Sequence, residues 1–163
     1  MHHFASVAKS LGYLSHLSYP EIVLIILSSG HPLPLPEGVI FLALGILAAK
    51  GSGSLLGYIL ISMLAMVIYD VVLFSFAYFG SKLVTKISTT AKSTWIDRYS
   101  GAGDSKMLFL TTVSHFVPGW RMVNPVIAAG IKIPPKKFVM YTLISAILYP
   151  PVYILIGFFL FKK

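Results

Sequence analysis

Three charged residues stand inside otherwise apolar stretches: Glu37, Asp70 and Arg121. A charge at membrane depth is costly, and it therefore indicates function by default. Arg121 begins a predicted helical leg, where the positive end of the helix dipole disfavours a cation. We therefore expect a negative partner, which is Glu37, Asp70 or an anionic ligand. A planar guanidinium beside backbone N–H groups suits a phosphate, and a permanent ion pair is the structural alternative.

The two carboxylates are candidates for binding and releasing protons. Glu37 opens a helical leg, where the structural alternative is simple stabilisation of the helix N-terminus. Asp70 lies within a long apolar segment and must point toward protein, so its structural alternative is a hydrogen bond to backbone. His115 precedes Arg121 and would be a protonatable neighbour of an anion site, although a lone histidine is more often a satisfied core residue. His31 is a weaker candidate of the same kind.

The composition predicts an integral membrane protein. Of the 163 residues 56% are hydrophobic and 11% are charged, whereas roughly a quarter are charged in a soluble domain. The net charge is +8. We interpret the basic residues as flanking apolar segments and facing lipid head groups, and not as a surface that binds nucleic acid. The absence of cysteine excludes thiol chemistry. Because no metal-binding, phosphate-loop or nucleophile motif is present, we predict no enzyme activity, metal or cofactor.

The apolar segments differ in length. Residues 54–80 and 138–161 are long enough to be transmembrane helices, since about 20 apolar residues cross the hydrocarbon core. The shorter legs 22–29 and 38–49, and 107–117 and 122–131, meet at proline-rich tips. They predict re-entrant hairpins over 20–49 and 107–131, with tips buried in protein or lining a wet cavity. One kinked span over 20–49 is the alternative.

The remaining segments are amphipathic, and the order of elements repeats. Residues 1–18 are expected to form an interfacial helix, and 81–106 an amphipathic connector. Tyr58–Ser62 resembles Tyr141–Ser145, and each half reads as a hairpin followed by one span. The predicted fold is thus an all-α integral membrane domain over 1–163, built as an inverted repeat, which is a common plan for secondary transporters.

With these residues in view, the chain resembles the DedA family, also called the SNARE-associated Golgi or VTT-domain family, over about residues 20–161. Residues 32–38 (PLPLPEG) fit the family's Pro-x-Pro-x-Glu element, and Asp70 ahead of Tyr78-Phe79-Gly80 is similar to a second element. Residues 115–121 (HFVPGWR), followed by Ala128-Ala129-Gly130, resemble its most specific element, Arg-Phe-x-Pro-Gly-x-Arg. The first arginine of that element is His115 here. An acid that many members carry before the proline-rich tip is missing, and Glu21 is the nearest.

The resemblance implies a lipid transporter or flippase in a prokaryotic plasma membrane, whose substrate is a polyprenyl phosphate, such as undecaprenyl phosphate, or a similar anionic lipid. Proton coupling of this transport is part of the expectation. Arg121, His115, Gly119 and Trp120 would bind the substrate, and Glu37 and Asp70 would couple protons. A proton- or ion-coupled transporter of a small solute, a phospholipid scramblase, an intramembrane lipid phosphatase and a purely structural membrane protein are the alternatives. Assembly into a homo-oligomer is left open.

Overall fold

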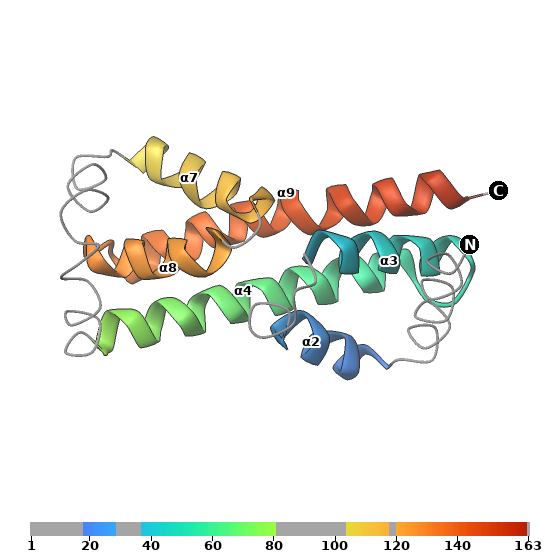
Figure 1. Cartoon of the computed structure of the whole chain (residues 1–163), viewed down its shortest axis with the longest axis horizontal. Helices are drawn as coiled ribbons and strands as arrows, with labels where there is room; N and C mark the ends of the chain where they lie inside the picture. Colours follow the sequence, from blue (N-terminus) through green and yellow to red (C-terminus); the bar gives the residue numbers. More distant parts are fainter. Residues whose placement is uncertain (1–17, 29–36, 81–103, 118–119, 163) are drawn as a thin grey trace, which may run out of the picture. The chain divides into compact units, whose positions relative to one another are not determined.

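Every regular element that the structure describes is a helix. This computed structural model describes residues 18–28, 37–80, 104–117 and 120–162. The helices are α2 (Tyr19–Ser28), α3 (Glu37–Ala49), α4 (Leu55–Phe79), α7 (Asp104–Phe116), α8 (Trp120–Gly130) and α9 (Pro135–Phe161), as labelled in Figure 1. Two short helices followed by one long helix occur twice along the chain. The prediction of an all-helical chain is confirmed for the described residues.

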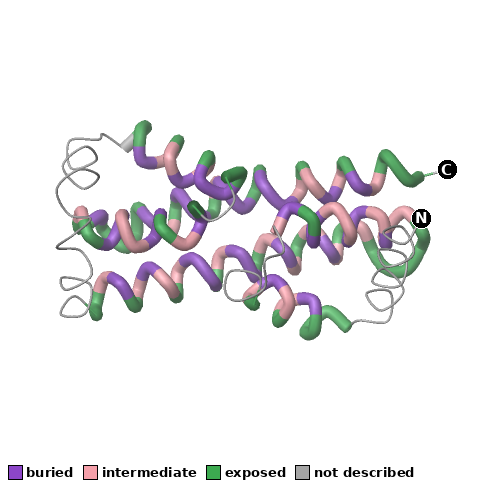
Figure 2. Tube along the Cα trace, in the orientation of Figure 1, coloured by how far each residue is buried: buried purple, intermediate pink, exposed green. Residues whose placement is uncertain are grey.

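The long helices α4 and α9 are long enough and apolar enough to cross a membrane, as the sequence predicts. Only 33% of the most apolar window of each helix is buried, whereas the core helix of a soluble protein is mostly buried. Buried and exposed turns alternate along both helices in Figure 2. Apart from the last residue, Phe79, the exposed positions of α4 are large hydrophobic side chains with a spacing of one helical turn: Leu56, Leu60, Leu64, Ile68, Val72 and Phe76.

Local sequence sets several helix ends. Ser18 and Glu21 form a capping box at the start of α2, in which the Ser18 backbone N–H and hydroxyl both donate to Glu21 Oε2 at 2.7 Å. α8 ends in a Schellman motif, because Ile133 N–H donates to the Ala128 carbonyl at 3.0 Å and Lys132 adopts a positive φ of 58°. α9 then begins at Pro135, earlier than the predicted residue 138, since proline is suited to the first turn of a helix.

The chain divides into two compact units, and each long helix contributes one half to each of them. Among the described residues, the first unit holds α2, α3, α4 up to Met66 and α9 from Ile147 onward. The second holds the rest of α4, α7, α8 and α9 up to Ala146. Pro150 and Pro151 remove the N–H groups that would bond the carbonyls of Ala146 and Ile147. The hydrogen-bond ladder of α9 is therefore interrupted where the helix passes from one unit to the other.

The first unit is held by a close approach of two backbones. A side chain at Gly45 of α3 would collide with the Ile154 carbonyl and come within 2.8 Å of the Phe158 amide nitrogen of α9. In the reciprocal contact, Gly157 lies against the Leu42 carbonyl. Small residues that allow such contact are typical of helices packed in membranes, where close van der Waals packing replaces the hydrophobic effect.

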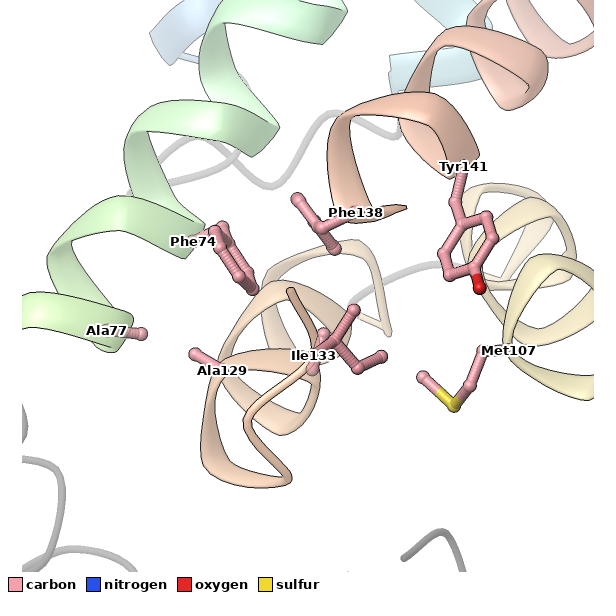
Figure 3. Packing of buried hydrophobic residues seen from close by; sticks show 8 residues of the cluster. Phe74, Ala77, Met107, Ala129, Ile133, Phe138 and Tyr141 are labelled. Carbon is pink, nitrogen blue, oxygen red and sulfur yellow. The ribbon is translucent and has the colours of Figure 1, made fainter. Parts of the chain in front are cut away.

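The second unit has an aromatic core. The rings of Phe74 on α4 and Phe138 on α9 stack with their centroids 4.2 Å apart and their planes 9° from parallel. Figure 3 shows this pair with residues from α7 and α8 around it. The full cluster of buried residues is Phe74, Ala77, Met107, Ala128, Ala129, Ile133, Phe138 and Tyr141. This packing fixes α4 against α8 and α9. Two of these helices carry charged residues described below, Asp70 on α4 and Arg121 on α8.

Parts of the predicted architecture lie outside the described residues: residues 1–17 of the interfacial helix, residues 29–36 of the first hairpin, residues 81–103 of the connector, and Pro118-Gly119 of the second hairpin. The end of the predicted connector is helical, because α7 begins at Asp104 and not at residue 107. The short legs are helices, but the re-entrant hairpins and the inverted repeat stay predictions.

Candidate functional site

Asp70, His115 and Arg121 meet inside the second unit. Asp70 lies within α4, His115 in the last turn of α7 and Arg121 in the first turn of α8. His115 Nε2 is 2.8 Å from Asp70 Oδ2, and Arg121 Nε donates to Asp70 Oδ1 at 3.3 Å. Asp70 is 1% exposed, His115 5% and Arg121 7%. One carboxylate therefore lies between two basic side chains, and all three are removed from the surface.

The end of α7 fixes the orientation of the histidine. His115 Nδ1 is 2.6 Å from the carbonyl oxygen of Thr111, four residues earlier on the same helix. A carbonyl oxygen only accepts, so Nδ1 carries the hydrogen. The last carbonyls of a helix form its negative end, where a histidinium is favourable. His115 is therefore placed where a positive charge is stabilised from both sides, by the helix end and by Asp70.

This tautomer of His115 has a consequence for its contact with Asp70. Because Nδ1 donates to Thr111, the short contact between Nε2 and Asp70 Oδ2 needs one more hydrogen, carried by either atom. If His115 carries it, the cluster holds two cations and one anion. If Asp70 carries it, the cluster holds the arginine cation and two neutral groups. In both cases the three side chains have a net charge of one positive unit.

Arg121 is held by a second contact besides Asp70. Its guanidinium carbon lies 4.4 Å from the ring centroid of Tyr69, the residue before Asp70 on α4. A cation over an aromatic face is attracted by the ring quadrupole. Asp70, one of the three candidates left open by the sequence, is thus a negative partner of Arg121.

The other predicted site residues are placed as follows. Glu37 belongs to the first unit, where it is the half-buried first residue of α3. Trp120 begins α8 and is 41% exposed. Gly119 and His31 lie outside the described residues. The structure thus brings together three of the predicted residues, and their functional roles stay predictions.

Sequence reasoning missed several polar residues of the second unit. Thr111 supplies the carbonyl that orients His115, and Tyr69 stacks on Arg121. Asn124, which is 7% exposed, is one turn after Arg121 on the same face of α8. The signal in the sequence was the spacing between Arg121 and Asn124, because a polar residue one helical turn after a charged residue is unusual in an apolar helix. The hydroxyls of Thr112 and Ser145 also share a hydrogen bond of 3.1 Å between α7 and α9.

The geometry limits the chemistry of the cluster. Ser114 is beside His115 in the sequence, but its hydroxyl donates to the Thr111 carbonyl at 2.7 Å. Both nitrogens of His115 are already engaged, one by Thr111 and one by Asp70, so the arrangement is not that of a serine nucleophile with its histidine base. Among the described residues, no group of three or more His, Asp or Glu side chains is placed to hold a metal ion.

Comparison with known proteins gives no relative: no family profile, no curated protein and no solved structure matches the chain. What the cluster can do must therefore be argued from its geometry. A buried set of side chains that includes an arginine and a histidine is suited to hold an anion.

Proposed function

We propose that this chain is an integral membrane transporter of an anionic lipid, and that Asp70, His115 and Arg121 hold the lipid phosphate during its passage. The observation that carries the proposal is that Arg121 and His115, both buried, meet at the Asp70 carboxylate. A buried guanidinium and a buried imidazole can both donate hydrogen bonds to phosphate oxygens, and the planar guanidinium can donate two in parallel. A polyprenyl phosphate provides that group together with an apolar tail.

The surroundings of the cluster support a lipid over a soluble anion. Three apolar residues adjacent in sequence to His115 and Arg121 are substantially exposed: Phe116 at 41%, Val117 at 39% and Trp120 at 41%. An apolar surface next to a buried charge matches the two parts of a lipid, with a head group that needs polar partners and a tail that needs none. The tail would stay in the bilayer while the head group occupies the cluster.

The architecture supports membrane transport. α4 and α9 would be the two spans, and the repeated order of two short helices and one long helix agrees with an inverted repeat of hairpin and span. The resemblance to the DedA family points the same way, toward a polyprenyl phosphate such as undecaprenyl phosphate and toward a prokaryotic inner membrane. In this proposal Glu37, at the head of α3, serves as a second proton-binding carboxylate.

Transport by the purified chain in liposomes tests the proposal. The three substrates are a polyprenyl phosphate, a glycerophospholipid and inorganic phosphate. We expect movement of the polyprenyl phosphate, a weak or absent response to the glycerophospholipid, and none to inorganic phosphate. Preferential movement of the glycerophospholipid would favour a scramblase, preferential movement of inorganic phosphate would favour a solute transporter, and release of free phosphate from the lipid would indicate a phosphatase.

Two variants separate a phosphate ligand from a structural ion pair. Arg121→Lys keeps the charge and loses the planar fork, so it should reduce transport at least tenfold if Arg121 binds phosphate, since about 1.4 kcal/mol corresponds to a factor of ten. Lys136→Gln is the matched control, because it removes a positive charge from an exposed position of the same unit. Asp70→Asn with Arg121→Gln removes both charges of the ion pair seen in the structure, and this double variant should fold and remain inactive. Restored transport in that double variant would eliminate Arg121 as the phosphate ligand.

A further inference from the structure

We infer that Asn124 is a specificity-determining residue, and that its side-chain amide selects a phosphomonoester over a phosphodiester. Asn124 lies on α8 one helical turn after Arg121, and it is 7% exposed. The inference rests on the proposed function, because it names the class of phosphate that the same site takes.

The buried face of α8 places Asn124 between the ion pair and the aromatic core. Arg121, Asn124 and Ala128 follow one another at spacings of three and four residues and are all buried, so they share one face of the helix. Arg121 bonds Asp70 on α4. Ala128 belongs to the aromatic core together with Phe74, which is one turn after Asp70 on α4. The amide of Asn124 therefore lies beside the ion pair, where the polar cluster borders the apolar core.

The amide of Asn124 makes no hydrogen bond within the part of the chain that the structure describes. Buried polar side chains are nearly always hydrogen-bonded, because an unmade bond costs the desolvation of the group. The hydroxyls of Thr111 and Thr142 in the same unit also have no partner among the described residues, but their oxygens are fully enclosed. Asn124 keeps a small accessible surface, so its amide is the one of these three groups that a ligand can reach.

The oxygen atoms of the phosphate give the amide its role. A phosphodiester has two oxygens that carry no carbon, which is the number that a planar guanidinium can bond in parallel. A phosphomonoester has a third. As an ionised oxygen this third atom accepts a hydrogen bond from the Asn124 amide nitrogen, and as a hydroxyl it donates to Asn124 Oδ1. A diester would set an apolar ester group against the amide and leave it unpaired, and polar sites discriminate strongly against such analogues.

Titration calorimetry on the full chain in detergent micelles compares dodecyl phosphate, a monoester, with methyl dodecyl phosphate, a diester. The two probes have the same tail, and at about pH 5 both are largely singly charged, because the second pKa of a phosphomonoester is about 6. We expect the wild type to bind the monoester at least tenfold more tightly. Tenfold corresponds to about 1.4 kcal/mol, which is near the lower end for a hydrogen bond to a charged group. Equal binding of the two esters would overturn the inference.

Asn124→Leu removes the amide and keeps a side chain of similar size. This variant should lose at least tenfold in affinity for dodecyl phosphate and keep its affinity for the diester, so that the preference disappears. Thr142→Val is the matched control, because it removes another buried polar group that has no partner among the described residues of the same unit, and it should keep the preference. A preference that is unchanged in Asn124→Leu would overturn the inference and leave the proposed function standing.

Unfolding without ligand separates an amide that binds substrate from one that holds the fold together. Replacing an unpaired buried amide with an apolar group of similar size removes a desolvation cost. Asn124→Leu should therefore unfold at no lower concentration of a denaturing detergent than the wild type does. A lower midpoint would show that the amide stabilises the fold itself, and it would overturn the inference.

Inorganic phosphate distinguishes a lipid from a small soluble anion, because it keeps the third oxygen and has no tail. We expect it to bind at least tenfold more weakly than dodecyl phosphate, since an apolar tail contributes about 0.8 kcal/mol per buried methylene and tenfold corresponds to about 1.4 kcal/mol. Equal binding of these two probes would overturn the assignment of the site to a lipid. Failure of the wild type to bind any of the three probes, or full binding of both esters by Arg121→Gln, would overturn the proposed function together with the inference.

Discussion

Replacing Asp70 with asparagine tests whether the carboxylate is what makes the buried cations tolerable. The side chain keeps its size and part of its hydrogen bonding, but the only negative charge of the three-residue cluster disappears. Unit charges 3.3 Å apart, the distance from Arg121 Nε to Asp70 Oδ1, attract by roughly 5 kcal/mol at an effective dielectric constant of about 20. Part of this attraction is offset by the desolvation of the two charges in the wild type.

We therefore expect Asp70→Asn to lower the free energy of unfolding by about 3 kcal/mol, near the lower end of the range for breaking a buried ion pair. The assay is reversible unfolding in mixed micelles with a denaturing detergent. Ser75→Ala on the same helix is the matched control, because its hydroxyl bonds only a carbonyl of its own helix among the contacts described, that of Val71 at 2.7 Å. It should stay within about 0.5 kcal/mol of the wild type.

A double-mutant cycle separates the ion pair from other effects of the substitution. Adding Arg121→Gln to Asp70→Asn removes the stranded cation, so the double variant should recover much of the lost stability, with a coupling energy of roughly 2 kcal/mol. If Asp70→Asn is as stable as Ser75→Ala, or if the two substitutions are simply additive, Asp70 does not compensate Arg121 and the argument for a charged buried cluster fails.

Three further predictions concern packing and local structure. Gly45→Ala should destabilise the first unit by about 1–3 kcal/mol, because the added methyl group meets backbone atoms of α9 that cannot move aside; Gly57→Ala, which meets the movable end of a tyrosine side chain, should cost clearly less in the same unfolding assay. Phe138→Ala should cost about 3–5 kcal/mol, since it removes one ring of the stacked pair in the second unit. Hydrogen bonds from Ser18 lower the pKa of Glu21 below its usual value. The capping box should therefore stabilise α2 fully at pH values above the usual pKa of glutamate, and this stabilisation should be lost as the pH falls through the lowered pKa. An NMR titration should show a higher pKa of Glu21 in Ser18→Ala, and an unchanged pKa would contradict the capping box.

The sequence by itself determined the helices. The lengths of the apolar runs set which helices could span a membrane, since the number of residues needed is fixed by the rise per residue and the thickness of the hydrocarbon core. Proline and glycine marked most of their ends, because they act on the backbone locally and leave a signal in the sequence. The start of α9 was missed by a few residues because the uncharged apolar run begins at Phe138, whereas the first turn of the helix begins with Pro135.

The sequence also showed which charges had to be explained, but only the tertiary structure decided how they pair. Glu37 and Asp70 were equally acceptable partners for Arg121, since each is a carboxylate in an apolar segment. The structure pairs Arg121 with Asp70, which is 51 positions away along the chain, and adds His115, which is 45 positions from Asp70. Such contacts depend on the rotation and axial register of α4 against α7 and α8, and these are set by packing such as the Phe74–Phe138 stack. No local pattern encodes that register, because it is a property of surfaces that form only when the helices meet.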